Sequence, residues 1–564
     1  MHRGEPTALS SLTGRLENVE DLFRRLEQLN EIGAALSGEK DLNGLLEKIL
    51  LAAKTITRAD GGTLYLVAED GSRLRFEIVR TGSLGVAMGG TTGNPVPFYP
   101  IHLHGKDGKP NYQMVAAYAA LTGKTVNIAD AYTEEGFDFS GTRNFDKKTG
   151  YRSKSFLTVP MANHEGAVIG VLQLINRQEP ETGEIVPFSH ADQRLAESLA
   201  SQAAIALTNR QLIIQLEQLF ESFIQLINTA IDEKSPYTGG HCQRVPMLTM
   251  MLAEAVNDTK DGPLKDFVMS EKDRYELKIA GLLHDCGKVT TPVHVVDKAT
   301  KLETIFDRIN LIDTRFEVLK RDAEITAVRQ KLDLARDNRL GEVDIRERFS
   351  QIDQSLRETL RKMDEDREFL RHCNVGAEAM APETQERVRR IGTDYRWIDV
   401  SGGNANFLTD DEIKNLSIAR GTLTSDERDV INHHIVATIK MLEALPWPKH
   451  LRNVPEYAGG HHERMDGKGY PRGLKRDEMS VQARVMGIAD IFEALTAKDR
   501  PYKRGKTLSE SLRILGNLKL GGHIDPDLFD IFIRKKVYLR YAEAFLDPEQ
   551  IDAVEESEVP GYSP

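Results

Sequence analysis

The chain has 564 residues, of which 40% are apolar and 28% charged, a composition typical of packed domains rather than of a disordered protein. At about 150 residues per domain, this length predicts three or four folded units. The 74 basic and 86 acidic side chains give a net charge of −12, which argues against binding to a nucleic acid polymer. Three cysteines and no apolar run of about 18 residues predict a cytoplasmic protein without a membrane-spanning helix.

Two segments carry apolar residues at spacings of three and four, the period of an amphipathic helix. One lies near the N-terminus, from Leu12 to Leu29, and the other runs from Leu212 to Ala230. Because such a seam can pair with a copy of itself, we expect a parallel homodimer held by these two helices. An ordinary packed helix is the alternative for the second segment.

The region between these helices predicts an α+β domain with an antiparallel sheet. Alternation of apolar and polar residues predicts a β-hairpin over 61–80 and two further strands over 155–177. A helix is expected over 116–128. We therefore place one α+β domain at residues 25–208.

The sequences TGYRSKSFLTVPM and GAVIGVLQLINR in this region resemble the second half of a GAF domain, a small-molecule sensor module. The stretch from Asn144 to Tyr151 further resembles GAF domains of cyclic-nucleotide-regulated enzymes. The resemblance implies a sensor that binds an unidentified small molecule. A GAF domain that serves only for dimerisation is the alternative.

Residues 301–420 differ in composition from their surroundings. The stretch from Lys320 to His372 is dense in charge, lacks proline and contains one glycine, Gly341. This pattern predicts two long helices in a hairpin. The mixed signs of the charges indicate a solvated surface rather than a nucleic-acid patch.

Histidines and aspartates between residues 237 and 503 stand in apolar helical contexts that would not tolerate them without partners. Two adjacent pairs are His284-Asp285 and His461-His462. Consecutive helical side chains point about 100° apart, so the members of each pair can serve two different metals. A ligand set of nitrogen and oxygen suits iron, manganese or zinc.

Helical periodicity indicates which of two neighbouring histidines, His433 or His434, points into the protein. Val430, Ile431, His434 and Ile435 share one apolar face, whereas His433 lies on the polar face. We therefore expect His434 to point inward as a ligand and His433 to face water.

The pattern HHExxDGxGYP at residues 461–471 and the pattern HDxGK at residues 284–288 resemble the HD-GYP phosphodiesterases, a subgroup of the HD metal-dependent phosphohydrolases. An upstream TxxHxxR and the sequence RPYK at 500–503 add to the resemblance. It implies an all-α domain that holds divalent metals and opens cyclic di-GMP to linear pGpG, with or without further cleavage to GMP.

The resemblance also implies roles for individual residues. The implied metal ligands are His241, His284, Asp285, His434, His461, His462 and Asp490. Asp285 and Lys288 would be the catalytic residues. Asp285 would bridge two metals, and Lys288 would contact the scissile phosphate or assist the leaving oxygen. Tyr470, Arg500 and Lys503 would bind the substrate.

Two departures from the family pattern matter. Tyr237 stands where some members have a glutamate that binds a third metal, which favours two metal ions over three. The two ions expected are iron or manganese. Glu493 stands where the family usually has aspartate, and the stretch from Asp490 to Arg500 is one residue longer.

The fold class expected is therefore a multidomain α+β protein: a GAF-type antiparallel sheet with helices, then an all-α HD-type hydrolase domain with a long helical insertion. The expected segments are an N-terminal helix (1–24), the GAF-like domain (25–208), a signalling helix (209–235), the first part of the HD-GYP domain (236–300), the insertion (301–420), the second part of the HD-GYP domain (421–548) and a flexible tail (549–564). The alternatives are a metal-dependent hydrolase of another cyclic dinucleotide or nucleotide, and a non-catalytic module that binds cyclic di-GMP.

Overall fold

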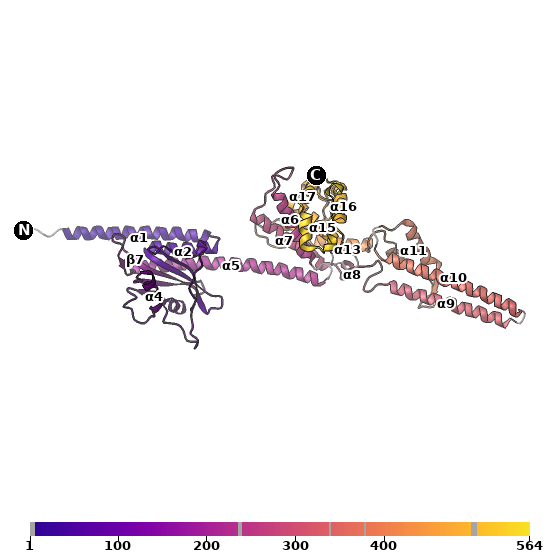
Figure 1. The fold of residues 1–564 in the computed structure, drawn as a ribbon, viewed down its shortest axis with the longest axis horizontal. Helices are drawn as coiled ribbons and strands as arrows, with labels where there is room; N and C mark the ends of the chain where they lie inside the picture. The colour runs from indigo at the N-terminus through magenta and orange to yellow at the C-terminus, as the bar shows by residue number, and fades with distance from the viewer. Residues whose placement is uncertain (1–5, 235–239, 338–339, 377–378, 498–504, 564) are drawn as a thin grey trace, which may run out of the picture. The chain divides into compact units, whose positions relative to one another are not determined.

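The computed structural model describes residues 6–234, 240–337, 340–376, 379–497 and 505–563. The chain divides into two compact units, residues 1–220 and 221–564 (Figure 1). In these described residues, no helix has the length and apolar character needed to cross a membrane.

The first unit is built on one antiparallel sheet. Its strand order is β3-β2-β1-β7-β6-β5, with β4 beside β2 and β8 beside β7. The strands are β1 (Ala59–Val67), β2 (Arg73–Thr81), β3 (Val86–Gly89), β4 (Ile101–His102), β5 (Val126–Ile128), β6 (Phe156–Ala162), β7 (Val168–Gln178) and β8 (Ile185–Val186). The two hairpins predicted from alternation, β1 with β2 and β6 with β7, are confirmed.

The helix predicted over 116–128 is wrong in its second half. Helix α3 (Val115–Thr122) ends at Gly123, which has a φ of 65° and donates its N–H to the carbonyl of Ala119. Glycine adopts this left-handed conformation without steric cost and commonly terminates helices. The residues that follow it form β5, which pairs with β6.

Long helices cover the sheet and carry much of the core. Helix α1 (Pro6–Gly38) extends past the predicted end at residue 24, and α5 (His190–Lys234) begins well before the predicted residue 209. Together with α2 (Leu42–Thr57) they supply buried residues to a core that also contains the sheet residues Leu64 and Leu172. Helix α4 (Ser140–Thr149) completes the unit.

A buried ion cluster links α1 to α5 and β7. The Asp192 side chain is fully buried and accepts hydrogen bonds from Arg25 and from Arg177 Nε, the latter at 2.9 Å. Arg25 also donates to the carbonyl of Ile56. Removal of one partner from such a cluster leaves buried charges without compensation.

We expect Asp192→Ala to destabilise the first unit by about 3–5 kcal/mol, because two arginines lose their buried counter-charge. Arg75→Ala is the control, since Arg75 is exposed and its pair with Glu77 should contribute less than about 1 kcal/mol. Denaturant unfolding followed by circular dichroism measures both. Equal unfolding midpoints for the two variants would refute a structural role for the buried cluster.

The second unit is mainly helical. Its helices after α5 are α6 (His241–Asn257), α7 (Glu271–Leu283), α8 (Val293–Val296), α9 (Ile309–Arg336), α10 (Glu342–Asn374), α11 (Pro382–Asp394), α12 (Asp410–Leu416), α13 (Ser425–Glu443), α14 (Val454–Gly459), α15 (Val481–Thr496), α16 (Leu508–Leu520), α17 (Pro526–Arg534) and α18 (Val537–Phe545). Short 3-10 turns connect several of them.

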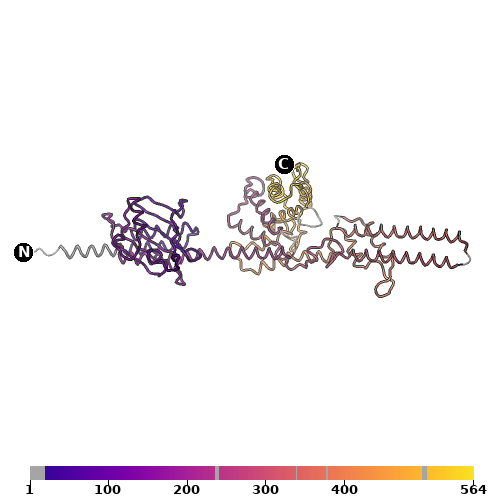
Figure 2. The backbone as a smooth tube through the Cα atoms, turned by 60° about the horizontal axis from the view of Figure 1, so that its bottom comes forward, coloured from indigo at the N-terminus to yellow at the C-terminus, as the bar shows by residue number. Residues whose placement is uncertain are grey.

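The charged insertion forms the predicted helical hairpin. Helices α9 and α10 lie side by side in both ribbon and tube views (Figures 1 and 2). An all-helical description of this region is incomplete, because β9 (Arg396–Ile398) and β10 (Asn404–Asn406) form a small antiparallel pair. Lys298, at the entry to the insertion, is buried and donates to Glu427 in the first turn of α13 at 2.8 Å.

The C-terminal segment, expected to be a flexible tail, packs against the second unit. The Asp552 carboxylate accepts hydrogen bonds from the backbone and side chain of Ser509. Gln550 Nε2 donates to the carbonyl of Thr496 at 2.9 Å, and Val559 is buried. These contacts tie the segment to α15 and α16.

Candidate metal centre

Three predicted residues meet where α6 begins and α7 ends. His241 is the first residue of α6, and His284-Asp285 directly follow α7. His241 Nε2 lies 3.1 Å and His284 Nε2 lies 3.2 Å from Asp285 Oδ2. One ligand atom from each residue falls within 4.8 Å of the others, close enough to hold one metal ion.

A second group of three histidines lies beside the first. His434 comes from α13, and His461-His462 follow α14. His462 Nε2 and His434 Nε2 are 3.2 Å apart, and one nitrogen of each of the three rings falls within 4.8 Å of the others. His434 is buried and His433 is exposed, as the apolar face of α13 predicts.

The carboxylate of Asp285 connects the two groups. Its Oδ2 faces His241 and His284, while its Oδ1 lies 3.3 Å from His434 Nε2. Asp490 on α15 adds a second carboxylate, whose Oδ1 is 3.3 Å from His241 Nε2. The structure therefore brings the seven predicted ligands together, from parts of the chain up to about 250 residues apart.

Backbone carbonyls orient three of the imidazoles. His284 Nδ1 pairs with the carbonyl of Gly281 at 2.7 Å, His461 Nδ1 with that of Ala458 at 2.6 Å, and His434 Nδ1 with that of Ile431. Each Nε2 is thereby left as the atom that faces the site. Among the described residues, the buried Nε2 atoms of His284 and His461 have no partner with hydrogen-bond geometry, which fits a group of atoms arranged to bind a metal.

Glu493 is the neighbour of this site that the sequence did not assign. Its carboxylate is fully buried, receives a hydrogen bond from Arg244 Nε at 2.7 Å and pairs with His241 Nδ1. An outer carboxylate of this kind fixes the orientation of a metal-binding imidazole. The signal available in the sequence was the position of Glu493 one helical turn after Asp490 on α15.

The local electrostatics keep the imidazoles of His461 and His462 neutral but not that of His241. Burial lowers the pKa of His241, but the carboxylates of Asp285, Asp490 and Glu493 raise it more, to well above its usual value. Burial raises the pKa of Asp285, but the nearby Lys288 ammonium and His284 lower it by more than burial raises it. The pKa of Asp285 therefore lies well below its usual range. Burial lowers the pKa of His462 to about 4. The pKa of His461 is also lowered, first by burial and then by the neighbouring His462 and His284. At neutral pH these two imidazoles are uncharged, which is the form that binds metals.

Lys288 contacts the Asp285 carboxylate directly. Its Nζ donates a 2.6 Å hydrogen bond to Asp285 Oδ2. Gly287, between them, leaves no room for a side chain, because a Cβ there would lie 2.0 Å from the carbonyl oxygen of His434. Its N–H donates to Thr438 Oγ1 at 2.9 Å, which joins this turn to α13.

The loop that carries Tyr470 is shaped by buried polar contacts. Glu463 accepts hydrogen bonds from the backbone N–H groups of Arg472 and Leu474 at 2.7 and 2.9 Å. Tyr470 stacks on His462, with ring centroids 4.9 Å apart and planes 18° apart. A predicted substrate-binding residue thus lies against the metal-site candidates. The other two, Arg500 and Lys503, lie outside the described residues.

We expect His434→Gln to lower the affinity of the protein for Mn²⁺ by at least about 10- to 100-fold, because a buried nitrogen ligand is lost. His433→Gln is the matched control on the exposed face and should bind as the unchanged protein does. Calorimetric titration measures both, with circular dichroism as the check on folding. Equal affinities of the two folded variants would remove His434 from the ligand set.

Comparisons with known proteins agree with this architecture. The model of the GAF domain matches residues 41–207, and two models described as HD domain match residues 238–347 and 410–528. The chain thus contains a GAF domain in its first unit and HD-domain sequence in its second. HD domains are metal-dependent phosphohydrolases, and the histidine and aspartate groups described above could bind a metal.

Three curated relatives extend the comparison. A "3'3'-cGAMP-specific phosphodiesterase 1" of Vibrio cholerae is 43% identical over 81 residues, 14% of this chain and 19% of that protein. A "Cyclic di-GMP phosphodiesterase" of Pseudomonas aeruginosa is 35% identical over 114 residues, 20% and 26% of the two chains. A "Probable cyclic di-GMP phosphodiesterase" of V. cholerae is 36% identical over 141 residues, 24% and 32% of the two chains. The matches cover less than a third of each relative's length.

Proposed function

We propose that this protein is a metal-dependent phosphodiesterase that opens cyclic di-GMP to pGpG under the control of its GAF domain. The observation that carries the proposal is the Asp285 carboxylate, whose two oxygens face two separate groups of imidazoles. The substrate is inferred from the names of the relatives and from the loop that ends in Tyr470 and Pro471. The similarity to these relatives supports phosphodiester hydrolysis by the part of the chain that matches the HD domain models.

The proposed cofactor is a pair of divalent ions, iron or manganese. His241 and His284 would hold one ion, His434, His461 and His462 the other, and Asp285 would bridge them. Asp490 lies nearest His241 and would complete the first group. When bound, such ions lower the pKa of a bound water toward about 7 and neutralise charge on a phosphodiester.

The protein's own residues would prepare the site for this reaction. Glu493 holds the His241 ring, and three backbone carbonyls hold His284, His434 and His461. The ammonium of Lys288 neutralises part of the Asp285 charge. We expect it also to contact a scissile phosphate or to assist the departing oxygen. The aromatic face of Tyr470 offers a platform beside the site.

The regulatory part of the proposal concerns α5, which leaves the GAF domain. Its residues Leu212, Leu216, Leu219, Phe223 and Leu226 are all more than half exposed. This apolar seam supports the proposed parallel homodimer, since it has no covering element within the described chain. The proposed GAF ligand is a small molecule, and the proposed location is the cytoplasm.

A second substrate has a specific observation in its favour. The relative with 43% identity is named for 3'3'-cGAMP, a cyclic dinucleotide with one guanine replaced by adenine. Both substrates present the same pair of phosphodiesters to the metal centre, so base contacts would decide between them.

We expect chromatography after incubation of Mn²⁺- or Fe²⁺-loaded protein to show pGpG, and Asp285→Ala to lower the rate by at least about 100-fold. Asp477→Ala is the control, because Asp477 is an exposed aspartate on the 3-10 turn after the Tyr470 loop. Parallel assays with 3'3'-cGAMP decide the substrate. Binding of either dinucleotide without turnover by metal-loaded protein would instead favour a non-catalytic binding module.

A further inference from the structure

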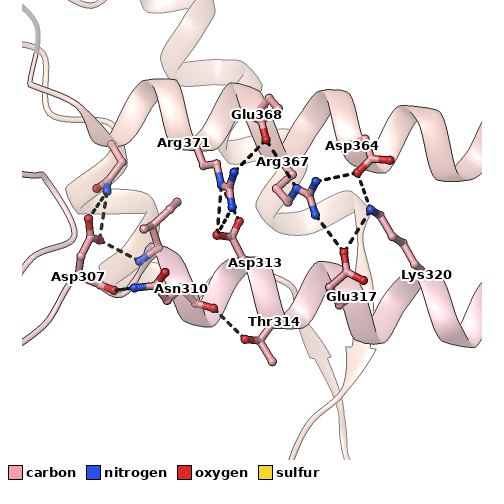
Figure 3. A network of polar contacts seen from close by, with 12 residues as sticks. Asp307, Asn310, Asp313, Thr314, Glu317, Lys320, Asp364, Arg367, Glu368 and Arg371 are labelled. Atoms are coloured by element: carbon pink, nitrogen blue, oxygen red, sulfur yellow. Dashed lines mark hydrogen bonds and ion pairs between the residues drawn. The ribbon is translucent and has the colours of Figure 1, made fainter.

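The hairpin of α9 and α10 has one covered and one uncovered face. The covered face of α9 packs Ile312, Phe316 and Leu319 into the core of the insertion. Along one flank, ion pairs join Asp313 to Arg371, Glu317 to Arg367 and Lys320 to Asp364 (Figure 3). These contacts fix which side of α9 faces α10.

The opposite side of α9 carries an apolar stripe. It consists of Leu311, Val318, Ile325, Val328 and Leu332, which are between 37 and 64% exposed. Four of them, at 311, 318, 325 and 332, recur every seven residues, the repeat of a coiled-coil seam. Exposed apolar side chains are common singly, but a seam at this period indicates a helical partner.

The charges that border the stripe select the partner. Asp322 and Arg329 lie along one edge, and Glu324 and Lys331 along the other. In the described part of the chain, neither Asp322 nor Arg329 makes an ion pair of its own, while Lys331 also pairs with Asp353 of α10. Two charges of opposite sign on each edge make the stripe self-complementary.

An antiparallel pair of α9 helices satisfies this pattern. With the twofold axis between Thr326 and Ala327, Ile325 faces Val328 of the second copy and Val318 faces Ala335 of the second copy. In an antiparallel coiled coil each edge meets the same edge of its partner. Asp322 then meets Arg329 of the second copy, and Glu324 meets Lys331 of the second copy, each pair occurring twice. Arg315 also meets Arg336 of the second copy, but its charge is already paired with Glu412.

A parallel pair is disfavoured by the same residues. It would place Glu317 beside Asp322 of the second copy and Lys331 beside Arg336 of the second copy, with only Glu324 beside Arg329 as an attractive pair. The two Arg321 side chains would also meet within the seam. Like charges at these positions oppose association.

We propose that the stripe on α9 is an interface for a second copy of this chain, bound antiparallel through the same stripe. The contact is isologous, because the same stripe on both copies forms it, and it therefore joins two chains only. The residues of this contact lie in the insertion and not on α5. In a chain that also pairs through α5, the contact would join dimers into larger assemblies. It requires neither the metal centre nor the proposed reaction.

Cysteine crosslinking of the full-length protein tests the orientation. The three native cysteines are buried, which keeps background low. Val318→Cys/Ala335→Cys should form a covalent dimer under mild oxidation, since these positions face each other in the antiparallel pair. Val318→Cys alone should not, because its two copies would lie about 25 Å apart along the axis. The proposal would be overturned if the single variant crosslinked as strongly as the double variant. It would also be overturned if neither variant formed a covalent dimer.

Charge exchange tests the recognition independently. Asp322→Arg should reduce self-association in sedimentation velocity, because Arg329 of the second copy then meets a like charge. Asp322→Arg/Arg329→Asp should restore it, since opposite charges meet again. Both substitutions lie on the exposed surface of α9, and circular dichroism checks that the helix content is kept. Identical sedimentation of the two variants would contradict the proposed pairing.

Discussion

The second unit is organised around one buried carboxylate that three imidazoles approach. Asp285 is almost fully buried, and its two oxygens lie 3.1–3.3 Å from nitrogens of His241, His284 and His434. A charge in such a place is strongly unfavourable unless cations or donors surround it, and Lys288 supplies one cation at 2.6 Å. The rest of the arrangement follows from the need to satisfy this group: α6, α7 and α13 converge on it, and Gly287 permits their close approach.

The chemistry proposed for the site depends on rigid imidazoles rather than on a flexible loop. Helical carbonyls of Gly281, Ile431 and Ala458 hold Nδ1 of three histidines and so direct Nε2 toward the centre. The same α13 carries His434 and, in its first turn, Glu427, which binds Lys298 at the entry to the insertion. The insertion is therefore connected to the site by a helix of the site itself, although its own apolar stripe lies elsewhere.

Residues with local signals or family motifs could be predicted, and individual contacts between distant segments could not. The inward position of His434 follows from the apolar face of α13, and the strand pairs follow from alternation around short turns. The position of Glu493 one helical turn after Asp490 was visible in the sequence, but its contact with His241 was not, because the two residues lie 252 positions apart. The end of α3 at Gly123 was missed because the apolar residues continue past the glycine. The strands β9 and β10 have only three residues each, too few for a period to be recognised.

The role of Asp285 is tested most directly by electron paramagnetic resonance of the Mn²⁺-loaded protein combined with its metal content. We expect two Mn²⁺ per chain with the spectrum of an exchange-coupled pair, since Asp285 would bridge the two ions. We also expect Asp285→Asn to weaken or abolish this coupling. A single bound ion, or two ions without coupling in the unchanged protein, would contradict the bridging role of Asp285.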